Sequence, residues 1–205
     1  MKPVYWEEAA RTLIDRDPVL RALIERFPGV TLRSRGDAFS TLARAIVGQQ
    51  ISVKAADSVW QRFLTVAGVV APRSVVERTV IELQRAGLSA RKAAYLQDLA
   101  RHFLDGTVNP GHWSGLDDDA LIAELTRVRG IGRWTAEMFL IFHLQRPNIL
   151  PVADLGLRKA VSLYYNRGRP ISVRRLQSLG RTWAPWRTVA TWYLWRSLDP
   201  VPVEY

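Results

Sequence analysis

Two glycines placed two residues apart, Gly130 and Gly132, constrain this chain most, because they interrupt two stretches of helical periodicity. Residues 117–129 begin with three aspartates and carry apolar residues at helical spacing. Residues 133–142 also carry apolar residues at helical spacing. Glycine adopts positive φ and lets another backbone approach closely, so the pattern predicts a helix, a tight turn and a second helix. N–H groups at the start of a helix bind anions, which makes the turn a candidate phosphate site.

The start of the second helix supplies the candidate contacts. Gly132, Arg133 and Thr135 lie in its first turn, where backbone N–H groups have no intrahelical acceptor. An ordinary turn between helices explains Gly-x-Gly equally well when the glycines are taken alone. The longer pattern Val-x-Gly-Ile-Gly-x-x-Thr-Ala, set between amphipathic helices, favours binding of a DNA backbone.

The charge balance points to the same kind of partner. The chain has 29 basic and 19 acidic residues in 205, a formal charge of +10, which favours a polyanion such as nucleic acid. A general basic bias is the alternative, since arginine far outnumbers lysine. With no cysteine, disulfides, thiolate zinc sites and iron–sulfur clusters are excluded. No membrane-length apolar run and no signal peptide occur, so we expect a soluble, cytoplasmic protein.

Helical periodicity covers most of the chain and predicts an all-α protein of about ten helices. Residues with good N-capping side chains, such as Ser52 and Ser89, precede apolar helical patterns, and glycines such as Gly68 follow them. Strand signals are confined to the short segments 29–33 and 68–71. The loop at 145–153 is the expected switch between two lobes.

Asp154 is the candidate for chemistry. It lies 22 residues after Gly132, follows Pro151 and precedes a helical pattern. The simplest interpretation is a helix N-cap, which contributes about 1 kcal/mol. An ionised carboxylate at this position, next to a sugar, would also stabilise an oxocarbenium-like cation or orient water. The two roles are compatible.

Other polar and aromatic residues are less specific. Gln49 and Gln50 are adjacent at a helix junction, where their amides are either solvent-exposed or able to fill a gap in a base stack and bond to base edges. Most tryptophans near the C-terminus are expected in the core, with one or two lining a pocket. No histidine has an acid or a second histidine at ligand spacing, so all three are expected at ordinary surface or core positions.

The hairpin, Asp154 and Gly48-Gln49-Gln50-Ile51-Ser52 together resemble the helix-hairpin-helix DNA glycosylases, and within them the alkylbase (DNA-3-methyladenine glycosylase II) branch. Arg133-Trp134-Thr135-Ala136 and Trp183-x-Pro185-Trp186-Arg187 match that branch, and the resemblance covers residues 35–197. It implies a two-lobed fold without the N-terminal β-domain of longer relatives. The lobe 38–147 would contain the hairpin, residues 1–37 plus 148–205 would form the other, and the active-site cleft would lie between them.

The resemblance also implies residue roles. Asp154 would be the catalytic acid, and Gln50, with Gln49 beside it, would fill the space left by a flipped base. A phosphate would be held by the backbone N–H groups of Gly130, Gly132 and Thr135. The base pocket would be bordered by Trp134, Met138 and Trp195. An alkali cation, Na⁺ or K⁺, would be bound by the main-chain carbonyls of Thr126, Val128 and Gly130. No cofactor is expected to be required.

One position refines the expected reaction. In bifunctional relatives a lysine stands two residues after the second hairpin glycine, whereas this chain has Trp134. The second acid that some relatives carry before the catalytic one is here Ala153. We therefore expect a monomeric, monofunctional glycosylase that removes alkylated purines from double-stranded DNA at the nucleoid, without strand cleavage. The alternatives are a glycosylase for oxidised or mismatched bases and a non-catalytic helix-hairpin-helix module.

Overall fold

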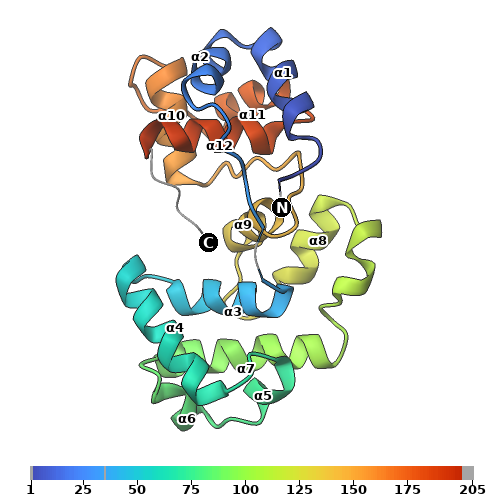
Figure 1. The fold of residues 1–205 in the computed structure, drawn as a ribbon, viewed down its shortest axis with the longest axis vertical. Coiled ribbons are helices and arrows are strands. Elements are labelled where there is room, and N and C mark those ends of the chain that lie inside the picture. The colour runs from blue at the N-terminus through green and yellow to red at the C-terminus, as the bar shows by residue number, and fades with distance from the viewer. Residues whose placement is uncertain (1, 35, 200–205) are drawn as a thin grey trace. The chain divides into compact units, whose positions relative to one another are not determined.

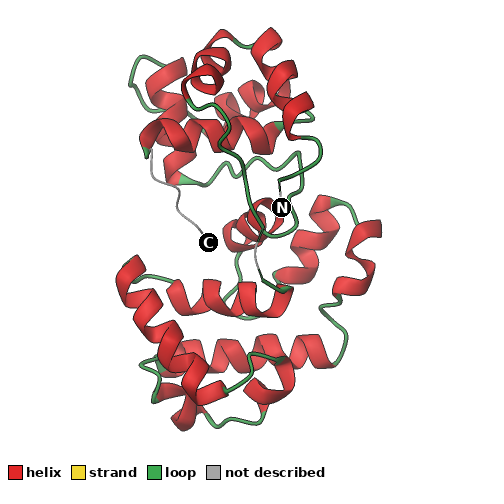
Figure 2. Cartoon of the chain, viewed as in Figure 1, coloured by secondary structure: helices red, strands yellow, loops and turns green. Residues whose placement is uncertain are grey.

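The computed structural model describes residues 2–34 and 36–199, and all regular secondary structure within them is helical (Figure 2). Twelve α-helices and one 3₁₀ helix occur in this part of the chain, which confirms the all-α prediction. None of these helices has both the length and the apolar character needed to span a membrane.

The chain divides into two compact units, and each contains its own core. The first unit comprises residues 1–34 and 140–205, and the second comprises residues 35–139. The division falls inside one helix, α9, between Phe139 and Leu140. The lobe limits and the cleft expected from the sequence stay predictions, and Met1, Arg35 and residues 200–205 lie outside the described residues.

The first unit is formed by the chain's two ends (Figure 1). Helices α1 and α12 both pack against α2, and α10 packs against α12. The helix bounds are α1 Trp6–Arg16, α2 Pro18–Arg26, α10 Leu155–Tyr165, α11 Val173–Thr182 and α12 Arg187–Leu198. Trp6 and Trp192 meet edge to face in the core, with ring centroids 5.3 Å apart. Buried Asp17 accepts hydrogen bonds from the Tyr165 hydroxyl at 2.8 Å and from the Trp183 indole at 3.1 Å.

The second unit is built around α7, which packs against α3, α5 and α6. Its helix bounds are α3 Ala38–Gly48, α4 Val53–Ala67, α5 Pro72–Val76, α6 Val80–Gln84, α7 Ala90–Leu104, η1 Pro110–Gly115, α8 Asp118–Leu125 and α9 Arg133–Phe142, the last of which continues into the first unit. Phe39 and Phe103 meet edge to face at 5.3 Å, joining α3 to α7. The apolar stripes of α3 and α7 therefore bury each other, as their helical spacing predicts.

Local capping explains where the helices begin. The side chains of Ser52 and Ser89 accept backbone N–H groups at the starts of α4 and α7, as expected from the sequence. Thr79 and Glu82 form a reciprocal capping box at α6. Such caps satisfy N–H groups that the helix itself leaves without acceptors.

Two details differ from the sequence-based expectations. The short helix α5 and the 3₁₀ helix η1 were not expected, because five or six residues are too few for a periodic apolar pattern. Residues 29–33 and 68–71 form no strand, in agreement with the all-α prediction.

Candidate active site and anion-binding hairpin

The turn between α8 and α9 has the geometry that its two glycines predict. Val128 and Ile131 are buried beneath it, and the N–H of Ile131 donates to the carbonyl of Val128 at 3.1 Å. Helix α9 begins at Arg133, and the Gly132 carbonyl accepts the N–H of Ala136 at 3.0 Å, which closes the first turn. The first N–H groups of a helix lack intrahelical acceptors, so this end of α9 offers donors to an anion.

The two glycines serve different needs. Gly130 has φ +89°, and a Cβ there would lie 2.2 Å from a ring carbon of Tyr95, so the fold itself requires glycine. Gly132 is not in the left-handed region, and a Cβ there would meet nothing within 4 Å. Nothing inside the protein explains glycine at position 132. A close approach by an external backbone would explain it.

Two residues of helix α7 contact the hairpin. The carboxylate of buried Asp98 accepts the backbone N–H of Arg129 at 2.9 Å and its Nε at 3.0 Å. Tyr95, one turn earlier on α7, provides the ring against which Gly130 packs. Sequence reasoning missed both α7 residues, because each contacts a segment about 30 positions away and neither belongs to a recognisable motif.

The two glutamines have different roles in the structure. Gln49 donates its side-chain amide to the Gly130 carbonyl at 2.8 Å and so joins the end of α3 to the hairpin. Gln50 is exposed and has φ +60°, an uncommon left-handed conformation for a residue with a side chain. Such backbone strain is concentrated at functional positions. The two glutamines therefore differ: Gln49 is bonded to the hairpin, whereas Gln50 is exposed and strained.

Lys92 also supports this segment. Its ammonium group donates to the carbonyl of Val47, at the end of α3, at 2.7 Å. Partial burial lowers the pKa of Lys92. A lysine held against a helix C-terminus complements the negative end of the helix dipole, so α7 stabilises both the Gln49–Gln50 segment and the hairpin.

The remaining predicted hairpin residues are placed as follows. Arg133 is exposed, and its guanidinium binds Glu137 at 3.0 Å and Asp119 at 3.1 Å. Thr135 is half-buried in the first turn of α9. Trp134 is 41% exposed and Met138 is buried, and their four-residue spacing puts both on one face of α9. Nothing in the structure tests their expected place in a base pocket.

Asp154 caps α10, as its sequence context predicts. Its Oδ1 accepts the backbone N–H of Leu157 at 2.6 Å and the indole N–H of Trp195 at 2.8 Å. Trp195 stacks on Phe142, with ring centroids 5.7 Å apart and planes 11° apart. The carboxylate is thus fixed by a helix N-terminus and by an aromatic pair on two other helices.

Gly156 leaves room for this arrangement. A Cβ at this position would lie 3.2 Å from both Asp154 Oδ1 and Trp195 Cδ1. That spacing is tighter than most Cβ contacts, so a side chain here would displace the carboxylate or the indole. Asp154 itself is half-buried, and the neighbouring Ala153 is exposed.

The other tryptophans of this region belong mainly to the core. Trp183 and Trp192 are buried, and Trp186 stacks against Tyr5 at 5.6 Å. Trp195 is the one among these four that binds Asp154. This distribution agrees with the expectation that most of the cluster is core.

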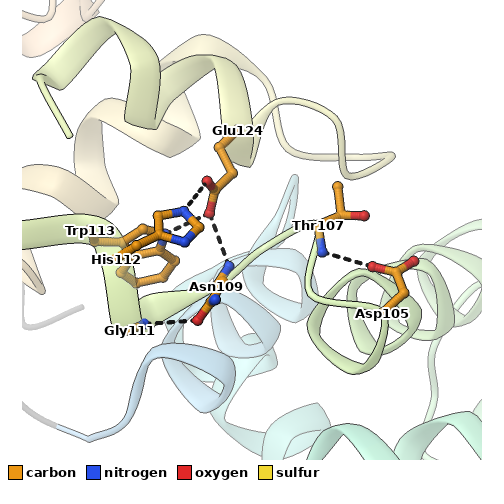
Figure 3. Close-up of polar contacts among 7 residues, drawn as sticks. All are labelled: Asp105, Thr107, Asn109, Gly111, His112, Trp113 and Glu124. Atoms are coloured by element: carbon orange, nitrogen blue, oxygen red, sulfur yellow. Dashed lines mark hydrogen bonds and ion pairs between the residues drawn. The ribbon is translucent and has the colours of Figure 1, made fainter. Parts of the chain in front are cut away.

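One histidine is more specifically bound than the sequence suggested. Buried Glu124, on α8, accepts hydrogen bonds from the Trp113 indole at 2.6 Å, from His112 at 2.8 Å and from the Asn109 N–H at 3.0 Å (Figure 3). Burial alone would raise the pKa of Glu124, but these hydrogen bonds hold it below its ordinary value. The expectation from the sequence concerned only partners at ligand spacing, so it did not include this pair, whose members are twelve residues apart.

The carbonyls expected to bind an alkali cation lie in the same turn. The Val128 carbonyl accepts the N–H of Ile131, and the Gly130 carbonyl accepts the Gln49 amide. Each carbonyl has a second lone pair, so these bonds leave acceptor capacity. Within the described residues no three His, Cys, Asp or Glu side chains gather as a metal site.

Two helices joined by a tight two-glycine turn, together with a capped carboxylate on a separate helix, define a helix-hairpin-helix protein with a candidate catalytic acid. The chain matches the model of the HhH-GPD superfamily base excision DNA repair proteins over residues 43–185. It belongs to this family.

Individual relatives agree with this assignment. The chain is 32% identical to DNA-3-methyladenine glycosylase 1 of Schizosaccharomyces pombe, over 78% of this chain and 72% of that protein. It is similar to the crystal structure of a DNA-3-methyladenine glycosidase from Bacillus halodurans, with TM-score 0.87, 33% identity and coverage of 93% and 89% of the two chains. The S. pombe 3-methyladenine DNA glycosylase in complex with abasic DNA has TM-score 0.81 and 28% identity, covering 97% of this chain and 98% of the other.

Proposed function

We propose that this protein is a monofunctional DNA glycosylase that hydrolyses the N-glycosidic bond of alkylated purines, of the 3-methyladenine and 7-methylguanine type, in double-stranded DNA. Relatives named as 3-methyladenine glycosylases support the substrate class. The observation that carries the proposal is the Asp154 carboxylate, fixed by the Leu157 N–H and the Trp195 indole and flanked by an exposed residue.

Binding begins at the hairpin. The first N–H groups of α9 bind a backbone phosphate, and glycine at position 132 lets that phosphate come close. Extruding the damaged nucleotide from the duplex costs a few kcal/mol. Gln50, held outward in its left-handed conformation, fills the space left in the base stack and offsets part of that cost.

Asp154 then acts on the sugar. As the bond from C1′ to the base nitrogen breaks, its electron pair leaves with the base and positive charge develops on the sugar. The carboxylate stabilises that charge and accepts a proton from the water whose oxygen forms the new bond to C1′. A base alkylated at N3 or N7 is cationic in DNA and leaves as a neutral molecule, so a site with one carboxylate is sufficient.

The aromatic residues select the base. We assign Trp134, Met138 and Trp195 to the pocket that receives it, because the face of tryptophan attracts a cationic ring. Trp134 also stands where a lyase would need a nucleophilic amine, so the product is an intact strand with an abasic site. Gel electrophoresis of the product before and after alkali treatment tests this point.

The hairpin carbonyls suit an alkali cation in their chemistry, since they are neutral oxygens of the kind that hard cations prefer. Thr126, Val128 and Gly130 would hold it. Such an ion would add positive charge beside the bound phosphate. No chemical step requires a cofactor.

The decisive test is base release from methylated DNA by the wild type and by Asp154→Asn. Asparagine still caps α10, so stability should fall by no more than about 1 kcal/mol. The single-turnover rate should fall by about 10²–10³, as expected when a charge that stabilises the transition state is removed. Asp117→Asn is the matched control, since Asp117 caps α8 through the same kind of bond to Ala120 and should retain full activity.

The same assay separates the alternatives. Release of 8-oxoguanine but not of methylated purines would contradict the proposed substrate class and favour a glycosylase for oxidised bases. Full activity in Asp154→Asn would remove the catalytic assignment, and an inactive wild type that binds DNA would indicate a binding module. We also propose that the protein acts as a monomer at the nucleoid, and light scattering with and without duplex DNA tests the oligomeric state.

A further inference from the structure

The segment from α10 to α12 has an unusual charge composition. Residues 155–198 contain nine basic side chains and no aspartate or glutamate. The nine are Arg158, Lys159, Arg167, Arg169, Arg174, Arg175, Arg181, Arg187 and Arg196. A solvated surface helix ordinarily mixes both signs of charge, so a stretch of one sign over three helices favours a polyanionic partner.

Three of the nine side chains are buried or half-buried. Arg158 and Arg187 donate to backbone carbonyls at 3.5 and 2.9 Å, and Arg196 is buried against the ring of Trp192. The other six are exposed. Among the described residues, no carboxylate lies within 4.0 Å of any of the six.

Some arginines of the second unit are paired with carboxylates. Arg44, Arg129 and Arg133 each bind at least one carboxylate, at distances of 2.7 to 3.1 Å. Their charge is therefore largely neutralised by neighbouring side chains. The segment from α10 to α12 differs in that it contains no aspartate or glutamate of its own.

The loop between α10 and α11 is firmly organised. The Asn166 side chain donates to the carbonyls of Arg169 and Pro170, both at 2.9 Å, and accepts from Arg175 at 2.7 Å. Arg167 has φ +54°, an uncommon conformation for a residue with a side chain. The loop thus presents Arg167 and Arg169 to solvent from a fixed backbone.

Helix α11 extends this surface. Arg174 and Arg181 are seven residues apart and lie on the same helical face, with Ser178, which accepts a bond from Arg181 at 3.0 Å, between them. We name five of the six exposed side chains, those of the α10–α11 loop and of α11, the α10–α11 basic corner. Its members are Arg167, Arg169, Arg174, Arg175 and Arg181.

The corner lies at the end of α10 opposite to Asp154. Helix α10 has 11 residues and is therefore about 16 Å long. This length corresponds to about five base-pair steps of duplex DNA. At this distance the corner cannot contact the reacting nucleotide, so any duplex that it binds is the flanking duplex.

We propose that the α10–α11 basic corner binds the phosphate backbone of the duplex that flanks the lesion, on one side of the damaged nucleotide. Arginine suits this role because its charge is permanent and its planar guanidinium donates two parallel hydrogen bonds to phosphate oxygens. The contact is independent of sequence and of the damaged base. The proposal rests on the proposed function, since DNA is the partner in both.

The test uses the full-length protein with Arg167→Gln/Arg169→Gln, and Arg11→Gln/Arg26→Gln as a control with the same change in net charge on other exposed arginines of the first unit. The probe is a duplex of about 30 base pairs containing a tetrahydrofuran abasic analogue, placed at the centre or about three base pairs from either end. Affinity is measured across a range of salt concentrations. Single-turnover base release at saturating protein is measured on methylated DNA.

With the centred probe, the corner variant should bind at least about fivefold more weakly at low salt, and its salt slope should fall by about two. That loss should disappear in one of the two end-placed probes, where the flank is missing. The control should bind like the wild type, and base release at saturation should be unchanged in both variants.

The inference is overturned if the corner variant binds the centred probe like the wild type, or if the variant's loss is equal on all three probes. Equal losses in the corner variant and the control would show a general charge effect and would also overturn it. Failure of the proposed function looks different, because the wild type itself would then release no base.

Discussion

At the hairpin, the side chains of Asp98, Tyr95 and Gln49 bind or pack against the protein's own backbone, whereas at the start of α10 the side chain of Asp154 is itself the proposed functional group. The hairpin leaves backbone N–H groups to contact the ligand. The α10 site leaves a carboxylate. In both places a helix N-terminus can stabilise negative charge: that of an external anion in the function proposed for the hairpin, and that of Asp154 at α10.

This difference predicts how each region responds to mutation. Backbone groups cannot be removed by substitution, so changes at the hairpin act mainly through folding or through steric blocking. A carboxylate can be removed without disturbing the helix that it caps. The hairpin should therefore couple stability to binding, and the α10 site should separate stability from activity.

Gly130→Ala should give the largest effect on folding. The new methyl group would overlap the Tyr95 ring, and alanine would have to adopt φ +89°. Overpacking and a left-handed conformation together should cost about 3 kcal/mol or more. Urea unfolding monitored by circular dichroism measures this loss. A fully stable Gly130→Ala would show that the hairpin can rearrange. Hairpin substitutions would then not differ from those at α10 in their effect on stability.

Gly132→Ala sharpens the comparison, because it changes the same turn where a Cβ has open space. Stability should fall by no more than about 1 kcal/mol. Affinity for duplex DNA should fall about tenfold, since the methyl group lies where we expect a phosphate to approach. Gly115→Ala is the matched control, because a Cβ at that position also meets nothing within 4 Å and Gly115 lies outside the hairpin. If Gly132→Ala bound duplex DNA with the same affinity as the wild type, the phosphate would not approach at this position.

Gly156→Ala tests the other region. Alanine favours a helix over glycine by up to about 1 kcal/mol, so the variant should be as stable as the wild type or slightly more stable. The new Cβ would lie 3.2 Å from Asp154 Oδ1 and would displace the carboxylate by a few tenths of an ångström. The single-turnover rate should fall about fivefold, as small misplacements of catalytic groups are costly. Ser162→Ala, on the same helix, controls for helix propensity; a variant with an unchanged rate would show that the carboxylate position is not critical.

The sequence was sufficient to predict the features that depend on local spacing. The hairpin glycines, the caps of α4, α7 and α10, and the all-α class all follow from patterns within about ten residues. The Asp154 cap was predicted in the same way, but its bond to Trp195 was not, since 41 positions separate the two residues. The different needs for glycine at positions 130 and 132 also required the structure, because only the position of Tyr95 distinguishes them.

The contacts that the sequence did not predict were mainly polar contacts between residues far apart in the chain. Asp98 looks like an ordinary helical acid in the sequence, yet it is buried and binds the hairpin backbone. Glu124 and His112 were missed for the same reason. A buried carboxylate is costly unless it is hydrogen-bonded, but the sequence of one chain does not show which acids are buried.

Glu124 gives the smallest expected effect and tests whether support of the hairpin depends on ionised groups. Burial works against ionisation of Glu124, but hydrogen bonds from Trp113, His112 and Asn109 hold its pKa below the ordinary value of 4.5. A carboxylate whose pKa is lower in the folded state stabilises the protein above its unfolded-state pKa and loses that contribution as the pH falls through the folded-state pKa. Glu124→Gln should therefore be less stable than the wild type near neutral pH, and the difference should shrink below about pH 4.5. Urea unfolding of both proteins from about pH 6 to about pH 3 measures this difference. A gap that stays constant over this range would mean that the ionised form contributes nothing, and the support of α8 would then depend only on packing and neutral hydrogen bonds.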